Sequence, residues 1–305
     1  MAKRERVSLA DLRVLDGGMA SELEHLGADI NGPLWSAQVL EDAPEKIVAV
    51  HRAYIEAGAD IIETASYQVS RGGYAEVGLD SSRADNALLR CVALAREAAA
   101  HFSDRRILVA ASLGPYGAVL HNGAEYHGNY DCSFANLIAF HRDRIEVLAR
   151  AEGREAPDLL AFETLPSLAE AEAIGQALAP YPELAVWFSF TCRDGQHVVH
   201  GELLRQCAAA VAGYPQTVAI GVNCTHPKFI PALIGVLRSA SEKPVIVYPN
   251  SGEGWDPERR SWTGISDSAG YGDLAKIWRA AGAQIIGGCC RTRPAHICQV
   301  ANLNP

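Results

Sequence analysis

Eight short apolar runs alternate along the chain with longer, alanine-rich amphipathic stretches. Near-continuous apolar strands separated by helices are typical of a parallel sheet that is covered on both faces. Eight such units predict a single closed (β/α)8 barrel, or TIM barrel, and a doubly wound open sheet is the alternative. The expected strands are residues 13–15, 60–62, 107–111, 159–162, 186–190, 218–222, 245–248 and 284–286.

Signals for helix ends fall between these runs. Asp42 and Ser167 each precede a helical stretch and have an acidic residue three places later, which predicts a capped helix start. Gly58 and Gly282 each end a helical stretch just before an apolar run. The sequence shows no linker, low-complexity segment or block of charge, so we expect residues 1–305 to form one domain.

Composition narrows the class of protein. The net charge of −9 over 305 residues argues against a surface for nucleic acid or for an anionic membrane. Eight cysteines are scattered along the chain, unlike the dense disulfide framework of a small secreted domain. No apolar run approaches membrane-spanning length, and no apolar segment follows the charged residues 1–6. We therefore expect a soluble, reduced, cytoplasmic protein.

Three cysteines follow apolar runs and suggest a metal site. Cys224 follows the run 218–222 after one intervening residue, and Cys289 and Cys290 follow the run 284–286 after two glycines. Neighbouring side chains of a regular strand point to opposite faces, so we expect Gly287 and Gly288 to let the chain leave strand geometry. Three thiolates would bind zinc and leave its fourth position open, as in catalytic sites. The alternative is three core cysteines, because free cysteine is among the most buried residue types.

Polar residues follow the other expected strands, and in a barrel they would share one mouth. Glu163 follows an apolar run, where an unpaired carboxylate is costly, so we expect a functional role for it. Asp16 either binds a ligand or closes a turn. The backbone amides of Gly17, Gly18 and Met19, near a helix start, are candidates to hold a carboxylate. The residues in these positions are 16–18, 63–64, 112, 163–164, 191–192, 223–224, 250–252 and 289–290.

Two neighbours of these candidates are assigned structural roles. Glu63 is expected to form an ion pair with an arginine. His226 precedes a proline and is expected to start a helix rather than to bind metal.

Two loops, 114–132 and 249–272, are longer than the architecture requires and would lie at the C-terminal face of the barrel. Their aromatic residues Tyr116, Tyr126 and Trp255 are candidates for cation–π contact with a cationic substrate. The alternative is that these rings only pack the loops onto the barrel.

Six motifs, in this order, resemble those of the homocysteine S-methyltransferase family, most of all its short bacterial and plant members that use S-methylmethionine or S-adenosylmethionine. The motifs are Leu-Asp-Gly-Gly-Met-Ala at 15–20, Thr-Ala-Ser-Tyr-Gln at 64–68, Phe-Glu-Thr-Leu-Pro at 162–166, Gly-Val-Asn-Cys at 221–224, Tyr-Pro-Asn-Ser-Gly-Glu at 248–253 and Gly-Gly-Cys-Cys-Arg-Thr at 287–292.

The resemblance implies a zinc-bearing TIM barrel in which Cys224, Cys289 and Cys290 are the Zn²⁺ ligands. It implies that a methyl group passes from a sulfonium donor to the thiolate of L-homocysteine, which yields methionine. The matched positions that hold the amino-acid part of homocysteine are Asp16, Gly17, Gly18, Thr64 and Glu163; we add Met19 and Asn223, which lie in the same motifs.

Other activities remain open on the same residues. They are a betaine-dependent or a selenocysteine or selenohomocysteine methyltransferase and, more distantly, a zinc hydrolase or a non-enzymatic zinc- or thiol-binding protein.

Overall fold

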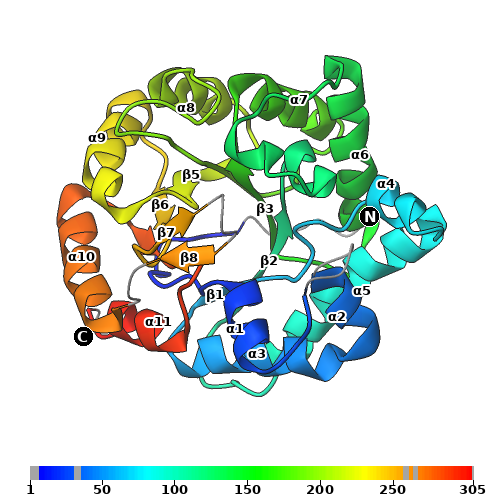
Figure 1. The fold of residues 1–305 in the computed structure, drawn as a ribbon, viewed down its shortest axis with the longest axis horizontal. Helices are drawn as coiled ribbons and strands as arrows, with labels where there is room; N and C mark the ends of the chain where they lie inside the picture. The colour runs from blue at the N-terminus through cyan, green and yellow to red at the C-terminus, as the bar shows by residue number, and fades with distance from the viewer. Residues whose placement is uncertain (1–6, 31–35, 257–260, 264–266, 304–305) are drawn as a thin grey trace.

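The structure is a computed structural model that describes residues 7–30, 36–256, 261–263 and 267–303. Its centre is a curled sheet of seven parallel strands in the order β1-β2-β3-β4-β5-β6-β9 (Figure 1). Seven of the eight predicted strands are thereby confirmed, with ends that differ by up to three residues. They are β1 (Ile61–Glu63), β2 (Leu108–Leu113), β3 (Leu159–Leu165), β4 (Val186–Phe190), β5 (Thr217–Asn223), β6 (Val245–Tyr248) and β9 (Ile285–Ile286).

The first predicted strand, residues 13–15, forms only two isolated parallel bridges. Val14 pairs with Ile286 of β9, and Leu15 pairs with Ile61 of β1, so this short segment connects both edge strands of the sheet. The carboxylate of Asp60 accepts the amides of Arg13 and Val14 at 3.0 and 3.1 Å. The Asp60 side chain thus accepts hydrogen bonds that the backbone of a longer strand would donate to a neighbouring strand. The curled sheet, with residues 13–15 between its two edge strands, is TIM-barrel-like.

Helices surround the sheet in a ring (Figure 1). Ser167 caps α7 (Leu168–Leu178) by accepting the amide of Glu170, as predicted. Gly58 and Gly282 have positive φ where α3 (Pro44–Glu56) and α10 (Ser268–Ala281) end. The predicted cap at Asp42 is wrong, because Ala43 is the N-cap of α3 and Pro44 starts the helix. The helices are α1 (Met19–His25), α2 (Ser36–Asp42), α3 (Pro44–Glu56), α4 (Arg71–Glu76), α5 (Ser81–Ala99), α6 (Phe134–Arg150), α7 (Leu168–Leu178), α8 (Leu204–Ala212), α9 (Ile230–Ala240), α10 (Ser268–Ala281) and α11 (Pro294–Ala301).

The apolar core has two parts because both faces of the sheet are covered. The larger part packs the outer face of the strands against the helices. The smaller part fills the inside of the curled sheet and includes Ile61, Ala110, Ala161 and Trp187. Since side chains alternate along a strand, the residues two places further toward the C-terminal ends also point inward. This alternation brings polar side chains to one end of the barrel-like sheet.

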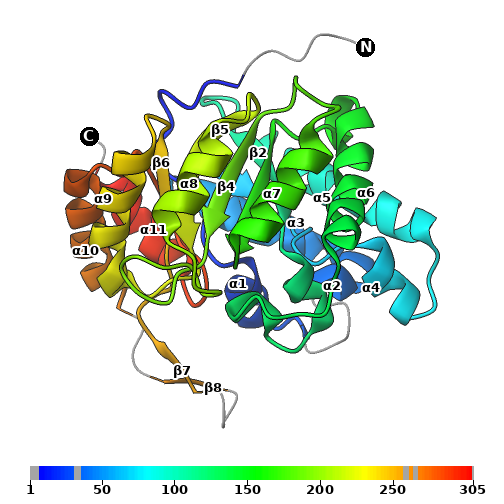
Figure 2. The same ribbon diagram turned by 90° about the horizontal axis from the view of Figure 1, so that it is seen from above.

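Both long loops lie at the C-terminal ends of strands. Residues 114–132 follow β2 and contain the 3₁₀ helices η1 (Tyr116–Leu120) and η2 (Ala124–Tyr126). The second loop includes an antiparallel pair, β7 (Gly254–Asp256) and β8 (Ser261–Thr263), which projects from the body of the molecule (Figure 2). The side chain of Trp255 lies outside the described residues, so its predicted role stays a prediction. None of the helices in the described ranges is long and apolar enough to cross a membrane.

Candidate active site

The structure brings the three predicted cysteines together. Cys224 directly follows β5, and Cys289 and Cys290 follow β9. Their sulfur atoms all lie within 4.8 Å of one another. Cys224 and Cys289 are paired as a disulfide, with their Sγ atoms 2.50 Å apart. The Sγ of Cys290 lies 3.5 Å from that of Cys224. Three sulfurs at one point fit zinc, which prefers thiolates and takes three protein ligands in catalytic sites.

The two glycines before the cysteine pair do not act as predicted. Neither Gly287 nor Gly288 has a positive φ in the described backbone. A Cβ on Gly287 would lie 2.6 Å from the Cβ of Leu15, and one on Gly288 would lie 2.3 Å from the Oγ1 of Thr292. Glycine is therefore required because neighbouring segments approach the backbone closely. The non-glycine residue with positive φ in this turn is Arg291, at 64°.

Glu163 lies inside the curled sheet, two residues beyond Ala161 in β3. Its side chain is 6% exposed, and it accepts hydrogen bonds from the hydroxyl of Ser112 in β2 and from the Nδ2 of Asn223 at 3.4 Å. Burial raises the pKa of Glu163 to about 7, although hydrogen bonds from Ser112 and Tyr248 oppose that rise. The carboxylate therefore lies beside the thiol cluster with a pKa near neutrality, which is typical of functional sites.

A bulge in β3 lies at Glu163, whose side chain points into the site. The register of β3 against β4 shifts between Phe162 and Leu165, and Thr164 has a φ of 56°. Asn223 holds this conformation, because its Oδ1 accepts the amide of Thr164 at 2.8 Å and its Nδ2 donates to the Oγ1 of Thr164 at 2.8 Å. Cys224 is itself strained, with a φ of 45°. Strained backbone held by surrounding bonds is common where side chains must be positioned for function.

Asp16 and Glu63 lie beside Glu163, and both carry an unsatisfied oxygen. The Oδ2 of Asp16 accepts the amide of Glu63 at 2.8 Å, whereas Asp16 Oδ1 and Glu63 Oε1 are buried and have no partner in the described part of the chain. Burial and the neighbouring charge of Glu163 raise the pKa of both side chains well above their usual range. Three clustered carboxylates, two of which have a free acceptor oxygen, favour a cationic ligand that donates hydrogen bonds.

The prediction that Glu63 is a structural ion-pair residue is therefore wrong. It faces Asp16 and Glu163, and a hydrogen bond joins its carboxyl group to that of Glu163. Its place as the inward-facing residue at the end of β1 is the signal that identifies it. Sequence reasoning also missed Tyr248, which lies at the same level of β6 and contacts Glu163 and the Nε1 of Trp187.

The remaining candidates differ in what their groups contact. The amide of Gly18 donates to the Oγ1 of Thr292 at 3.1 Å, so it is occupied, while the amides of Gly17 and Met19 donate no hydrogen bond within the described residues. The hydroxyl of Thr64 lies 2.6 Å from that of Ser66 and accepts the amide of Ser112. His226 caps η4 (Pro227–Phe229) by accepting the amide of Lys228, as predicted.

A buried polar cluster anchors the 114–132 loop. Glu170 in α7 accepts the amide of Tyr116 at 2.5 Å, the hydroxyl of Tyr130 and the Nε2 of His141 at 3.0 Å. Arg144 in α6 donates to the carbonyl of Gly114 at 2.8 Å. These bonds hold both ends of the loop against the outside of the sheet. The ring of Tyr116 packs edge-on against Phe140 in this cluster, which supports a packing role for it.

We expect the Glu170→Ala variant to lose about 3–5 kcal/mol of unfolding free energy, because it leaves several buried polar partners of one network unsatisfied. Denaturant unfolding measures this change. Glu172→Ala is the matched control, since Glu172 is exposed on the same helix and should change stability by less than about 0.5 kcal/mol. Equal effects of the two substitutions would contradict an anchoring role for Glu170.

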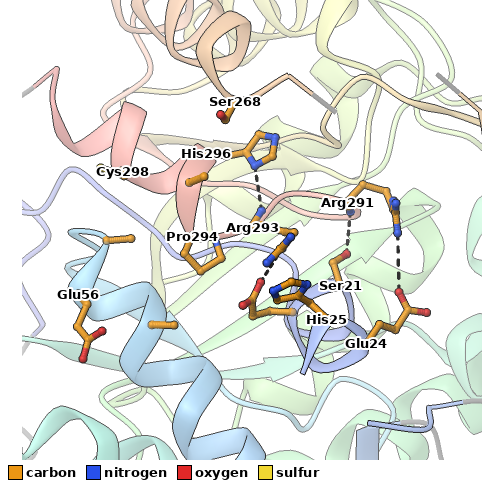
Figure 3. A pocket seen from close by; sticks show the side chains of 14 residues that line it. Ser21, Glu24, His25, Glu56, Ser268, Arg291, Arg293, Pro294, His296 and Cys298 are labelled. Carbon is orange, nitrogen blue, oxygen red and sulfur yellow. Dashed lines mark hydrogen bonds and ion pairs between the residues drawn. The ribbon is translucent and has the colours of Figure 1, made fainter. Parts of the chain in front are cut away.

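A cavity of about 910 Å³ lies next to the turn that follows Cys290, between α1, α3 and α11. Figure 3 shows that its arginines point toward acidic side chains of α1: Arg293 lies 2.9 Å from Glu22, and Arg291 lies 3.9 Å from Glu24. The amide of Arg291 donates to the hydroxyl of Ser21 at 2.9 Å. These contacts fasten the segment after the cysteine pair to α1. None of the three cysteines and none of the three clustered carboxylates lines this cavity.

The chain is similar to known proteins along nearly its whole length. The model of a protein family described as Homocysteine S-methyltransferase matches residues 13–303. The chain is 44% identical over 298 residues to homocysteine S-methyltransferase YbgG of Bacillus subtilis, covering 95% of this chain and 93% of that protein. It is 41% identical over 303 residues to selenocysteine Se-methyltransferase of Brassica oleracea, covering 93% and 86%.

A solved structure resembles the fold along its whole length. The metallated form of the homocysteine methyltransferase MmuM from Escherichia coli superposes with a TM-score of 0.85 at 42% identity, covering 96% of each chain. In that structure the relative is in its metallated form. The extent of these matches and the motifs they include show that the chain belongs to the homocysteine S-methyltransferase family.

Proposed function

We propose that this protein is a zinc-dependent enzyme that transfers a methyl group from a sulfonium donor to the thiolate of L-homocysteine and so forms methionine. Residues 1–305 would act as one (β/α)8 barrel domain with the metal at its C-terminal face. The observation that carries the proposal is the position of three sulfurs within 4.8 Å of one another beside three buried carboxylates, two of which have unpartnered oxygens. This combination suits a ligand with both a thiol and an ammonium group.

Cys224, Cys289 and Cys290 would hold the zinc, which requires all three as thiolates. A reducing, cytoplasmic location suits that requirement. When bound, the metal supplies a positive charge that removes the proton of a coordinating thiol. An aliphatic thiol has an ordinary pKa of about 8.5 and is mostly protonated at neutral pH. A thiolate nucleophile at neutral pH thus depends on this site.

The carboxylates would bind the ammonium group of homocysteine. An ammonium donates three hydrogen bonds, and Asp16 Oδ1 and Glu63 Oε1 are buried oxygens that no described residue supplies with a donor. Glu163 supplies a third carboxylate and is held in place by Ser112 and Asn223. The amides of Gly17 and Met19 remain candidates for the carboxylate of homocysteine, whereas Gly18 serves through the close approach of its backbone to Cys289.

The residues of the chain would orient the two substrates for direct displacement. The thiolate sulfur of homocysteine forms a bond to the methyl carbon, and the bond from that carbon to the donor sulfur breaks. The electron pair goes to the donor sulfur, which leaves as a neutral thioether, so no acid has to protonate the leaving group. The role of the protein is then activation of the thiol and alignment of two bound molecules.

A test is to incubate the purified protein with homocysteine and, in turn, S-methylmethionine, S-adenosylmethionine and betaine, and to measure methionine by mass spectrometry. We expect methionine with at least one sulfonium donor and none above background with betaine. The selenocysteine-methylating relative makes selenocysteine a second acceptor to include. The proposal would be contradicted if betaine were the only donor that gave methionine, or if none of the three donors gave it.

A further inference from the structure

Glu125 has a buried carboxylate oxygen that the reaction described above leaves without a function. It lies in η2 (Ala124–Tyr126), within the loop between β2 and α6. Its Oε2 is shielded from solvent and has no hydrogen-bond partner among the residues that the structure describes, although the carboxylate also contacts its own backbone amide. A buried carboxylate oxygen without a donor is costly, so the site is suited to a ligand that supplies one.

The surroundings of Glu125 place it at the thiol cluster. The hydroxyl of the next residue, Tyr126, forms a hydrogen bond with the thiol of Cys290, while Tyr126 as a whole is 49% exposed. The charge of Glu125 acts directly on Cys290 and also on Tyr67. Glu125 is thus near the proposed site of methyl transfer, but it comes from the long loop rather than from a strand of the barrel-like sheet.

The loop holds Glu125 in a fixed position. Glu170 and Arg144 anchor residues on both sides of η2. Between these anchors, η1 packs closely on η2, because a Cβ on Gly117 would lie 2.6 Å from the backbone nitrogen of Glu125. A carboxylate that is fixed in this way can select a ligand group by its position.

The chemistry of the ligand follows from the missing hydrogen bond. A sulfonium ion is positively charged but has no N–H or O–H group, whereas an ammonium donates three hydrogen bonds. In the proposed function, the carboxylates of Asp16, Glu63 and Glu163 already accept the hydrogen bonds of the homocysteine ammonium group. A donor that is itself an amino acid brings a second ammonium group, which needs its own acceptor.

We propose that Glu125 binds the α-ammonium group of the methyl donor, so that the loop 114–132 provides the donor subsite. This inference rests on the proposed function, and it deepens it by selecting donors that are amino acids. S-methylmethionine fits the subsite, and a sulfonium compound without an amino group loses this contact.

Kinetics of the Glu125→Gln variant test the subsite with two donors, S-methylmethionine and its deaminated analogue 4-(dimethylsulfonio)butanoate. We expect the KM for S-methylmethionine to rise about 10–100-fold, the range for a hydrogen bond to a charged group. The KM for homocysteine should stay within about twofold of wild type. The preference in kcat/KM for S-methylmethionine over the analogue should largely disappear. Glu155→Gln is the control, because Glu155 is exposed at the opposite ends of the strands, just before β3.

Calorimetry of S-methylmethionine binding without homocysteine separates this inference from the proposed function. Suppose that the wild-type protein makes methionine and that Glu125→Gln has the same KM for S-methylmethionine and the same donor preference as wild type. That result would overturn the donor subsite and leave the proposed function standing. If wild type makes no methionine, equal binding of S-methylmethionine to both proteins, or binding to neither, would also overturn it. If Glu125→Gln does not fold, Glu125→Asp takes its place, and weaker donor binding is still expected because the shorter side chain moves the carboxylate.

Discussion

The Cys289→Ala variant is expected to lose both its zinc and its activity. The substitution leaves Cys224 and Cys290 as the two remaining sulfurs, 3.5 Å apart, and two thiolates do not complete the three-ligand set of a catalytic zinc. We expect less than about 0.1 zinc per chain, and a rate of methionine formation at least about 100-fold below wild type, since losing a ligand costs more than losing a hydrogen bond to one. Elemental analysis and a methionine assay on the same sample measure both.

Cys298→Ala is the control for this substitution, because Cys298 is an exposed free thiol in α11. It should keep wild-type zinc and activity. A Cys289→Ala protein that folds and still carries about one zinc per chain would show that the metal binds elsewhere. Zinc loss with an unchanged rate would instead separate the metal from the reaction.

The Glu163→Gln variant should bind homocysteine about 10–100-fold more weakly, because the amide retains the shape of the side chain but not its charge. In wild type, burial places the pKa of Glu163 at about 7, so its charge is lost as the pH falls through that value. Affinity for homocysteine should therefore decline below pH 7 in wild type, and this part of the decline should be absent in the variant. Titration calorimetry from pH 6 to pH 8 measures both effects.

The same carboxyl group should make stability depend on pH. Its pKa of about 7 in the folded protein is above the ordinary value of 4.5, so the folded protein retains a proton that the unfolded chain has lost between these values. The free energy of unfolding consequently falls as the pH rises through this range, and Glu163→Gln should flatten that slope. Glu183→Gln, an exposed position before β4, should leave both pH profiles unchanged. A Glu163→Gln profile that matches wild type would contradict the role given to its charge.

Much of the sheet could be predicted because fully buried strands leave a clear apolar pattern. The first strand was the exception: residues 13–15 are apolar enough, but the side chain of Asp60 takes the amides of Arg13 and Val14. A pattern in one segment does not reveal a side chain from another that competes for its hydrogen bonds. The glycines at 287 and 288 illustrate the same limit, since they are needed for contacts with Leu15 and Thr292.

The part of the candidate site that lies at the ends of strands could be predicted from the sequence. Strand order brings Cys224, Cys289 and Glu163 to one end of the sheet, and the sequence indicated that end correctly. Glu63 was misassigned because its neighbours Asp16 and Glu163 are known only once the sheet has curled. Glu125 was missed because it lies within a loop, where no periodic pattern tells which side chains turn inward. The donor-binding role proposed for it depends on contacts that only the folded loop provides.

The most direct test of the central claim is methionine formation from homocysteine and S-methylmethionine by a single preparation that is assayed as purified, after removal of metal by a chelator, and after zinc is restored. The account predicts a rate that follows zinc content, reaches its maximum at about one zinc per chain and returns on reconstitution. Full activity in protein stripped of metal, or no methionine from protein carrying one zinc, would contradict it.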